Sequence, residues 1–194
     1  MLDNNLNTLE YTIASSSTKG FELIQEKLSA VEQLLRTTPL GHHEILNHAT
    51  EQLFLAGGKR IRVGISLLSA GVFDADYKRS ISLAAGIEML HTATLVHDDL
   101  IDGSLLRRGL PTLNAGDNAE LSVLIGDYLF ARAANLVAAT DNVKIMDQFA
   151  QTLMTILNGE ITQQFTRWEF SHQGYYDRIY AKTGAMFVLA AKSP

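Results

Sequence analysis

Hydrophobic side chains recur every three or four positions along most of the chain, the spacing that places them on one face of an α-helix. The first such stripe consists of Phe21, Ile24, Leu28, Val31 and Leu35. Similar patterns predict further helices near 43–56, 59–72, 77–102, 119–140, 143–167 and 175–192. No segment alternates polar and apolar residues as a half-buried strand does. The pattern predicts one all-α domain over residues 1–194, an orthogonal bundle of helices preceded by a frayed tail at 1–15.

The composition narrows the class of protein. The chain has 194 residues, no cysteine and a formal net charge of −5. The lack of cysteine excludes disulfides and thiolate metal sites, and the acidic balance gives no general attraction to nucleic acid. The start of the chain has no signal-peptide pattern, and no apolar run reaches the ~18 residues that a membrane span needs. We therefore expect a soluble, cytoplasmic protein with no nucleic-acid partner and no transmembrane segment.

An acidic cluster, DDLID, ends the fourth predicted helix. On a helix Asp98 and Asp102 share a face, Asp99 lies about 100° away, and His91 lies two turns before Asp98. Like charges at this spacing destabilise a helix by ~0.2–0.5 kcal/mol per pair, so a bound cation would compensate for the repulsion. Carboxylate oxygens suit Mg²⁺, which keeps water ligands and binds substrate phosphates. A solvated acidic helix end is the alternative explanation of the same pattern.

Two basic clusters accompany the acidic one. The segment GGKRIR places two glycines before a helix N-terminus, where backbone can approach an anion closely. Lys59 and Arg62 share a face of that helix, whereas Arg60 points elsewhere. Arg107 and Arg108 follow the acidic cluster in a loop, and arginine binds phosphate through two parallel hydrogen bonds. A helix cap or surface salt bridges would explain either cluster alone. Together with the aspartates, the clusters indicate two phosphorylated substrates, one bound with metal and one without.

The order of these motifs resembles that of the trans-type isoprenyl diphosphate synthases, also called polyprenyl synthetases. The resemblance covers nearly the whole chain and rests on GGKRIR (57–62), IEMLHTATLVHDDLID (87–102), RRGLPT (107–112), GDYLFARA (126–133), GEITQ (159–163) and YAKTG (180–184). It implies an all-α fold of the isoprenoid synthase type. It also implies a prenyltransferase that condenses an allylic diphosphate with isopentenyl diphosphate, releases pyrophosphate and forms a linear trans-polyprenyl diphosphate. Mg²⁺ as cofactor and a homodimer are further implications of the resemblance.

The resemblance assigns a role to each matching residue. The direct metal ligands would be Asp98 and Asp102, with Asp99 in support. The allylic diphosphate would contact Arg107 and Lys182. The residues that would bind isopentenyl diphosphate are Lys59, Arg62, His91 and Arg108. Thr183 and Gln163 would face the reacting carbons, and the released pyrophosphate would remove the proton because no side chain is an evident base.

The chain departs from the family pattern in one major respect. In the family a second aspartate-rich motif on a later helix faces the first and completes the metal cage, and these 194 residues contain no second motif. We therefore expect the chain to be part of a longer protein and to be inactive, or nearly so, by itself. The alternative is a non-catalytic partner subunit of a heteromeric synthase. Two local departures, Val63 in place of proline and Gly184 in place of alanine, are conservative for the chemistry.

The residues one turn before the aspartates bear on product length. Ala93 and Thr94 are small, whereas aromatic residues at these positions block elongation in the family, so the resemblance implies a product longer than farnesyl. Two other enzyme classes are alternatives. A class I terpene cyclase is disfavoured because it would lack the basic clusters. A phosphohydrolase built on a metal-binding His97–Asp98 dyad is disfavoured because its further ligands have no clear candidates.

Overall fold

The computed structural model describes residues 20–37, 43–55, 57–116, 119–165 and 171–193. Within these ranges the chain is almost entirely helical, as the periodicity predicted. The helices are α2 (Gln25–Thr37), α3 (Glu44–Leu55), α4 (Ile61–Val72), α5 (Tyr77–Ile101), α6 (Ala119–Ala138), α7 (Val143–Phe165), α8 (His172–Ile179) and α9 (Ala185–Lys192). A π-helical turn, η2 (Tyr180–Gly184), joins α8 to α9, and a 3₁₀ turn, η1 (Leu113–Gly116), precedes α6. The predicted tail at 1–15 lies outside the described residues.

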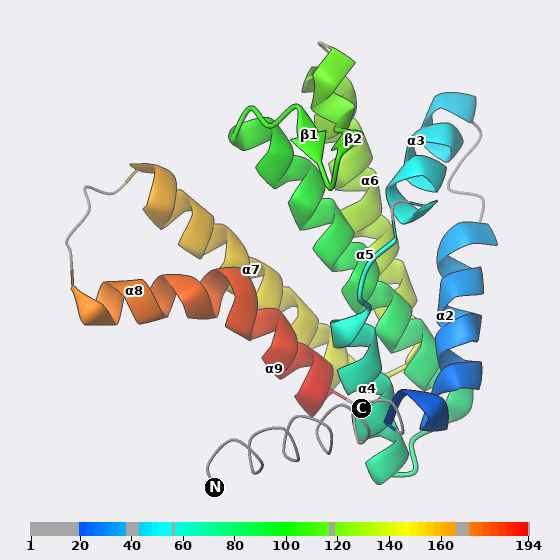
Figure 1. Cartoon of the computed structure of the whole chain (residues 1–194). Helices are drawn as coiled ribbons and strands as arrows, with labels where there is room; N and C mark the ends of the chain where they lie inside the picture. The colour runs from blue at the N-terminus through cyan, green and yellow to red at the C-terminus, as the bar shows by residue number, and fades with distance from the viewer. Residues whose placement is uncertain (1–19, 38–42, 56, 117–118, 166–170, 194) are drawn as a thin grey trace, which may run out of the picture.

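Helix α5 is the centre of the bundle, with α6 alongside it and α2 and α4 packed against its other sides (Figure 1). The helix begins after Asp76, whose carboxylate accepts a hydrogen bond of 2.9 Å from the backbone N–H of Arg79. This is the usual stabilisation of a helix N-terminus. From Ile81 to Leu90 nearly every residue is buried. Helix α5 is therefore covered on several sides.

The close approach of α5 and α6 depends on Gly126. A Cβ atom at this position would overlap the ring of His97. That ring packs edge-on against Phe130 at 5.2 Å, and its Nε2 atom lies 3.3 Å from the carbonyl oxygen of Val123 and 3.6 Å from Asp127. His97 thus connects the two helices.

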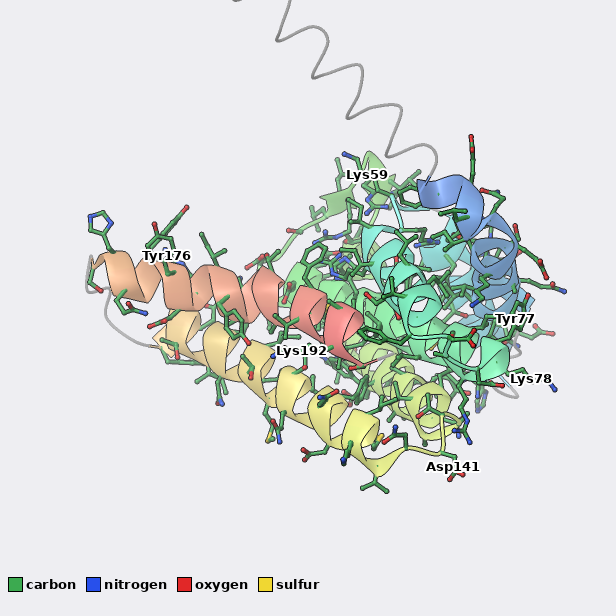
Figure 2. The ribbon with its side chains drawn as sticks, turned by 90° about the horizontal axis from the view of Figure 1, so that it is seen from below. Lys59, Tyr77, Lys78, Asp141, Tyr176 and Lys192 are labelled. Carbon is green, nitrogen blue, oxygen red and sulfur yellow. The ribbon has the colours of Figure 1, made fainter. Side chains whose placement is uncertain are left out.

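Helix α7 and the α8–η2–α9 segment run side by side and form an arm that extends from the bundle (Figure 1). Tyr176 lies near the outer end of this arm (Figure 2). A Cβ atom on Gly159 of α7 would overlap the Cβ atom of Ala181 in η2. Glycine at this position therefore allows two segments that are distant in sequence, GEITQ and YAKTG, to lie in direct contact.

Two local features differ from the predicted pattern. The loop after α5 contains a short antiparallel hairpin, in which β1 (Leu106–Arg107) pairs with β2 (Leu110–Pro111). Its turn residues, Arg108 and Gly109, have φ angles of 54° and 79°, as in the type I′ turn that suits two-residue hairpins. The helix predicted over 175–192 is also interrupted, because η2 separates α8 from α9.

Helix α6 is long and apolar enough, by length and composition, to cross a membrane, contrary to the reading of the sequence that found no such run. In the structure this helix packs along α5, and 39% of its apolar window is buried inside the protein. A core helix of a soluble protein has the same properties. The expected absence of a transmembrane segment therefore stays a prediction.

Candidate functional site

The candidate site surrounds the C-terminal half of α5. A pocket of about 480 Å³ opens between α3, α5 and the β1–β2 hairpin. Its apolar walls include Leu53, Leu95, Val96, Leu110 and Leu113. The charged and titratable residues that line it are Arg60, Glu88, His91, Asp99, Arg107 and Arg108. Four residues predicted from the sequence thus reach one pocket, whereas Asp98 and Asp102 do not line it.

His91 lies within the field of several arginines. Burial lowers the pKa of His91 from its ordinary value of 6.5 to about 3, and Arg62, Arg108, Arg107 and Arg60 act in the same direction. The ring is therefore neutral at pH 7 and donates through one nitrogen only, while the arginines supply the positive charge. The fold brings together three of the four residues predicted to bind isopentenyl diphosphate: Arg62, His91 and Arg108.

The buried neutral ring of His91 predicts an acid-sensitive fold. Between pH 6.5 and 3 the unfolded chain binds a proton that the native His91 does not, so the free energy of unfolding falls as the pH falls. The full free energy of unfolding is reached above pH 6.5. Below that pH it falls with a slope that approaches about 1.4 kcal/mol per pH unit. Urea denaturation followed by circular dichroism at several pH values measures this slope, which His91→Gln should reduce. The control is His48→Gln, at an exposed position. Equal slopes in the two variants would contradict the prediction.

Arg62 is held by packing. Its guanidinium carbon lies 4.9 Å from the centre of the Phe187 ring of α9. Its buried Nε atom has no hydrogen-bond partner among the residues that the structure describes. Burial lowers the pKa of Arg62, and the nearby charge of Glu88 opposes that shift. An arginine fixed by stacking in this way retains N–H groups for an anion. Lys59 is exposed, and its predicted contact with the same anion stays a prediction.

The consecutive arginines of the hairpin bind different partners. Arg107 donates from Nε and Nη2 to the two carboxylate oxygens of Asp99, both at 2.8 Å. This two-point pairing with Asp99 raises the pKa of Arg107, and it engages the carboxylate that was predicted to support a metal. Arg108 donates from Nη1 to the carbonyl oxygen of Gly57. The hairpin is thereby tied to α5 by one arginine and to the GGKRIR segment by the next.

Asp98 belongs to a second group of charges, to which α7 and η2 contribute. Nζ of Lys182 lies 2.8 Å from Oε2 of Glu160. Burial raises the pKa of Asp98 from 3.8 to about 6; Glu160 and Asp102 raise it further, and Lys182 opposes them. The carboxylate is therefore poorly compensated by the cations around it. The fold places Asp98 in the electrostatic range of Lys182, as the predicted site requires, and adds Glu160.

Gln163 and Thr183 lie on the two segments that meet at this second group. Gln163 follows Glu160 by three residues on α7 and is half-buried, whereas Thr183 follows Lys182 in η2 and is exposed. Contact between α7 and η2 brings the two segments together. The predicted role of both side chains, facing the reacting carbons, stays a prediction.

Gly159→Ala is expected to disturb this second group. The added methyl group would overlap Ala181 and push η2 away from α7, which separates Lys182 from Glu160. We expect the free energy of unfolding to fall by about 1–3 kcal/mol, as for other overpacked cores, measured by urea denaturation. The matched control is Gly71→Ala near the end of α4. No atom lies within 4 Å of the Cβ added there, so alanine should be neutral or slightly stabilising. Equal effects of the two substitutions would contradict the role of Gly159.

The oxygen atoms of Asp98 and Asp102 fit a magnesium ion in part. No group of three or more His, Cys, Asp or Glu side chains in the described part of the chain is placed to hold a metal ion. Burial is the main cause of the raised pKa of Asp98, and the nearby carboxylates of Glu160 and Asp102 raise it further. Mg²⁺ commonly binds through one or two carboxylates and completes its shell with water and phosphate oxygens. The residues present suit an ion that is carried with a diphosphate, and they do not form a closed protein site.

Two carboxylates of the site were assigned no role from the sequence. Glu88 is buried in α5 and accepts a hydrogen bond of 2.7 Å from Nη1 of Arg60. A signal for it was present, since a single acid within an apolar helical segment needs a buried partner. Glu160 gave no comparable signal, because an acid on an amphipathic helix is ordinarily solvated. Its importance depends on the fold of η2.

Comparisons with known proteins agree with this arrangement of motifs. Residues 43–194 match the model of the polyprenyl synthetase family. The chain is 35% identical over 183 residues to a prenyl transferase of Synechocystis sp., an alignment that covers 92% of this chain and 57% of the relative. It is 34% identical over 174 residues to heptaprenyl diphosphate synthase component 2 of Geobacillus stearothermophilus, covering 89% and 54%. The chain thus spans somewhat more than half the length of these curated relatives.

The fold of the chain also agrees with that of a solved polyprenyl synthase. The crystal structure of a polyprenyl synthase from Caulobacter crescentus CB15, complexed with calcium and isoprenyl diphosphate, superposes with a TM-score of 0.84 at 34% identity. The superposition covers 91% of this chain and 54% of that structure. The predicted all-α fold of the isoprenoid synthase type is therefore confirmed. By its motifs, its fold and a family match over most of its length, the chain belongs to the polyprenyl synthetase family.

Proposed function

We propose that this chain provides the two diphosphate-binding regions of a trans-prenyltransferase. The enzyme would condense an allylic diphosphate with isopentenyl diphosphate, release pyrophosphate and form a linear trans-polyprenyl diphosphate. The observation that carries the proposal is the pair of unlike charge groups beside α5. One group is basic and contains Arg62, His91 and Arg108. The other contains Asp98, Glu160 and Lys182 and has an excess of carboxylate.

Each group suits one substrate. The basic group would hold the diphosphate of isopentenyl diphosphate directly, through Arg62, Arg108 and the single N–H of His91, with Lys59 at its exposed edge. Asp98 and Asp102 would hold the allylic diphosphate together with Mg²⁺. Lys182 would add a direct contact, and Arg107 has an Nη1 atom outside its pairing with Asp99. The crystal structure of the Caulobacter polyprenyl synthase is a complex with calcium and isoprenyl diphosphate, which supports the binding of both a divalent cation and a diphosphate.

The residues also suit the chemistry of the reaction. When bound at Asp98 and Asp102, Mg²⁺ would stabilise the negative charge of the departing pyrophosphate. Lys182 and Arg107 would stabilise the same charge directly. The apolar surroundings of α5 would exclude water, which would otherwise consume the allylic carbocation. The double bond of isopentenyl diphosphate would attack that cation and leave a new cationic carbon. Pyrophosphate would accept a proton from the carbon next to it, and a new double bond would form.

Product chromatography tests the proposal. Purified protein is incubated with Mg²⁺, labelled isopentenyl diphosphate and, in turn, geranyl, farnesyl and geranylgeranyl diphosphate as primers. A labelled polyprenyl diphosphate that requires both primer and Mg²⁺ is the expected result for the catalytically complete protein. A cyclic hydrocarbon formed from the primer alone would instead identify a terpene cyclase and overturn the proposal. From the sequence we expect the 194-residue chain alone to show little or no turnover.

A second candidate is a non-catalytic subunit of a heteromeric synthase. The name of the Geobacillus relative, component 2 of a heptaprenyl diphosphate synthase, favours a partner for some members of the family. In that case the chain would bind diphosphates without turning them over, and activity would appear only with a second polypeptide. Assays with and without co-expressed partner chains, combined with sedimentation to separate a homodimer from a hetero-oligomer, distinguish the two candidates. A homodimer in the cytoplasm is our expectation.

We further propose that the residue at position 93 limits the length of the product. Ala93 and Thr94 are both buried in α5, and from the family resemblance we infer that their small side chains would permit a product longer than farnesyl. Ala93→Phe in the catalytically complete protein is expected to shorten the main product by at least one isoprene unit, and Ala93→Leu should give an intermediate shift. Chromatography of the dephosphorylated products measures the change, with melting curves to verify folding. An unchanged product distribution from folded protein would contradict the proposed position of the growing tail.

A further inference from the structure

Arg60 is the most constrained side chain of the GGKRIR segment. Its guanidinium is 9% exposed and pairs with two carboxylates from different helices. Nε lies 2.5 Å from Oε1 of Glu32 in α2, with Nη2 at 3.4 Å from the second oxygen of the same carboxylate. Nη1 lies 2.7 Å from Oε1 of Glu88 in α5. Arg60 therefore connects the segment before α4 to both α2 and α5.

The backbone of the same segment is held in an uncommon conformation. Arg60 has φ 51° and ψ 32°, the left-handed region that non-glycine residues seldom adopt, and no side chain caps the helix that follows. Such a conformation persists only where the surrounding structure fixes it. The fixing contacts are the ion pairs of Arg60 and the hydrogen bond from Arg108 to Gly57. Gly58 lies between the two guanidiniums, since a Cβ there would be 3.1 Å from Nη1 of Arg60 and 3.4 Å from Nη1 of Arg108.

The ion pairs also decide which arginine is neutralised. Arg60 and Arg62 are two residues apart, and the carboxylate of Glu88 acts on the charge of both. The short contacts, however, go to Arg60 alone. Arg62 stacks on Phe187 and keeps its guanidinium beside His91. Because the short contacts of both carboxylates go to Arg60, Arg62 forms no ion pair with either of them.

We propose that Glu32 and Glu88 are positioning residues for the isopentenyl diphosphate region. They hold Arg60, and through it the backbone of residues 57–62, so that Lys59 and Arg62 are presented to the diphosphate. This inference rests on the proposed function for the identity of the ligand. It adds to that function two carboxylates whose role is to hold Arg60 and not to bind the diphosphate.

The direction of the change in diphosphate affinity on substitution of Glu88 distinguishes a positioning role from a simple electrostatic one. Glu88 carries negative charge near a region that binds an anion, so the removal of that charge would by itself tighten anion binding. If Glu88 acts by holding Arg60, the same substitution weakens binding because the segment loses an anchor. The two explanations therefore predict opposite changes in the dissociation constant of one ligand.

The test compares Glu88→Gln and Glu32→Gln with Glu26→Gln. Glu26 lies on α2 like Glu32, but it accepts its hydrogen bond from the hydroxyl of Tyr77 on α5. Isothermal titration with isopentenyl diphosphate, without primer, measures binding in the absence of turnover. We expect Glu88→Gln to weaken binding by about tenfold or more, Glu32→Gln to weaken it less, and Glu26→Gln to leave it unchanged. Equal or tighter binding by Glu88→Gln would overturn the inference.

Amide hydrogen exchange of peptides spanning residues 57–62 supplies a readout that needs no ligand. Exchange in Glu88→Gln should be several-fold faster than in the wild-type chain, while peptides from α6 exchange at unchanged rates. If the wild-type chain binds no isopentenyl diphosphate, the proposed function fails for this chain. The exchange rates alone then test whether Glu32 and Glu88 anchor residues 57–62. Unchanged exchange at 57–62 in both Glu88→Gln and Glu32→Gln would overturn the anchoring whatever the ligand.

Discussion

Asp98→Asn is expected to lower the turnover of the catalytically complete enzyme by about 10²–10³-fold or more. The substitution removes one of the two carboxylates that we propose to hold Mg²⁺ with the allylic diphosphate, and electrostatic groups that act on a departing anion contribute effects of this size. The amide keeps the size of the side chain, and it removes a carboxylate whose pKa is already raised by burial and by Glu160. The fold should therefore be retained. Initial rates with saturating primer and isopentenyl diphosphate measure the loss.

Asp127→Asn is the matched control for Asp98→Asn. Asp127 is an exposed carboxylate on α6 that faces His97, so the change in net charge is the same while the candidate site is left intact. Isothermal titration with Mg²⁺ and inorganic pyrophosphate provides a readout besides turnover, and Asp98→Asn should weaken the joint binding while Asp127→Asn should not. Comparable losses in the two variants would show that Asp98 acts through net charge or folding.

Arg60→Met is expected to lower the free energy of unfolding by about 3–5 kcal/mol. Removal of one partner from a buried ion pair leaves the other charge buried and unpaired, which accounts for losses of this size. Here the side chain of Glu88 is 7% exposed and that of Glu32 is 26% exposed. The unpaired charge of Glu88 therefore accounts for most of the loss. Urea denaturation at pH 7, monitored by circular dichroism, measures the change.

The pH dependence of the Arg60→Met effect offers a further check. The hydrogen bond from Arg60 is the main cause of the lowered pKa of Glu32. A carboxyl with a depressed native pKa stabilises the fold above the pKa of the unfolded chain, near 4.5, and this contribution is lost as the pH falls through the native pKa. The difference between Arg60→Met and wild type should therefore shrink below about pH 4.5. The control is Arg36→Met, which removes an exposed pair with Glu32 and should cost at most about 1 kcal/mol.

The periodicity of the sequence predicted the helices because burial of one face is a local pattern, repeated over many turns. That His91 and Arg108 lie near each other was also predictable, since both were assigned to isopentenyl diphosphate. Arg107, which was assigned to the other substrate, lines the same pocket. The neutral state of His91 was not predictable, because it depends on arginines that the hairpin and α4 bring from other parts of the chain. The same reason applies to the ion pair between Glu160 and Lys182, which needs the contact between α7 and η2.

The role of Arg60 shows a different limit of sequence reasoning. Helical spacing was the wrong basis for placing its side chain, because α4 begins at Ile61 and Arg60 precedes it in the left-handed region. No local pattern names its partners either, which lie 28 residues away on each side. The π-helical turn was equally hidden, since YAKTG has ordinary helical composition. In both cases the deciding contacts are tertiary, and a single sequence contains them only as isolated polar residues in apolar surroundings.

The hairpin that carries Arg107 and Arg108 also limits which changes of chain length the protein accepts. Neighbouring residues of a strand face opposite sides, and here one arginine reaches Asp99 while the next, at the turn, reaches Gly57. Substitution of the exposed Leu106 or Leu110 leaves this division intact. Insertion or deletion of a single residue between α5 and Arg107 is expected to displace both arginines from these partners. The segment is therefore tolerant in composition and strict in length.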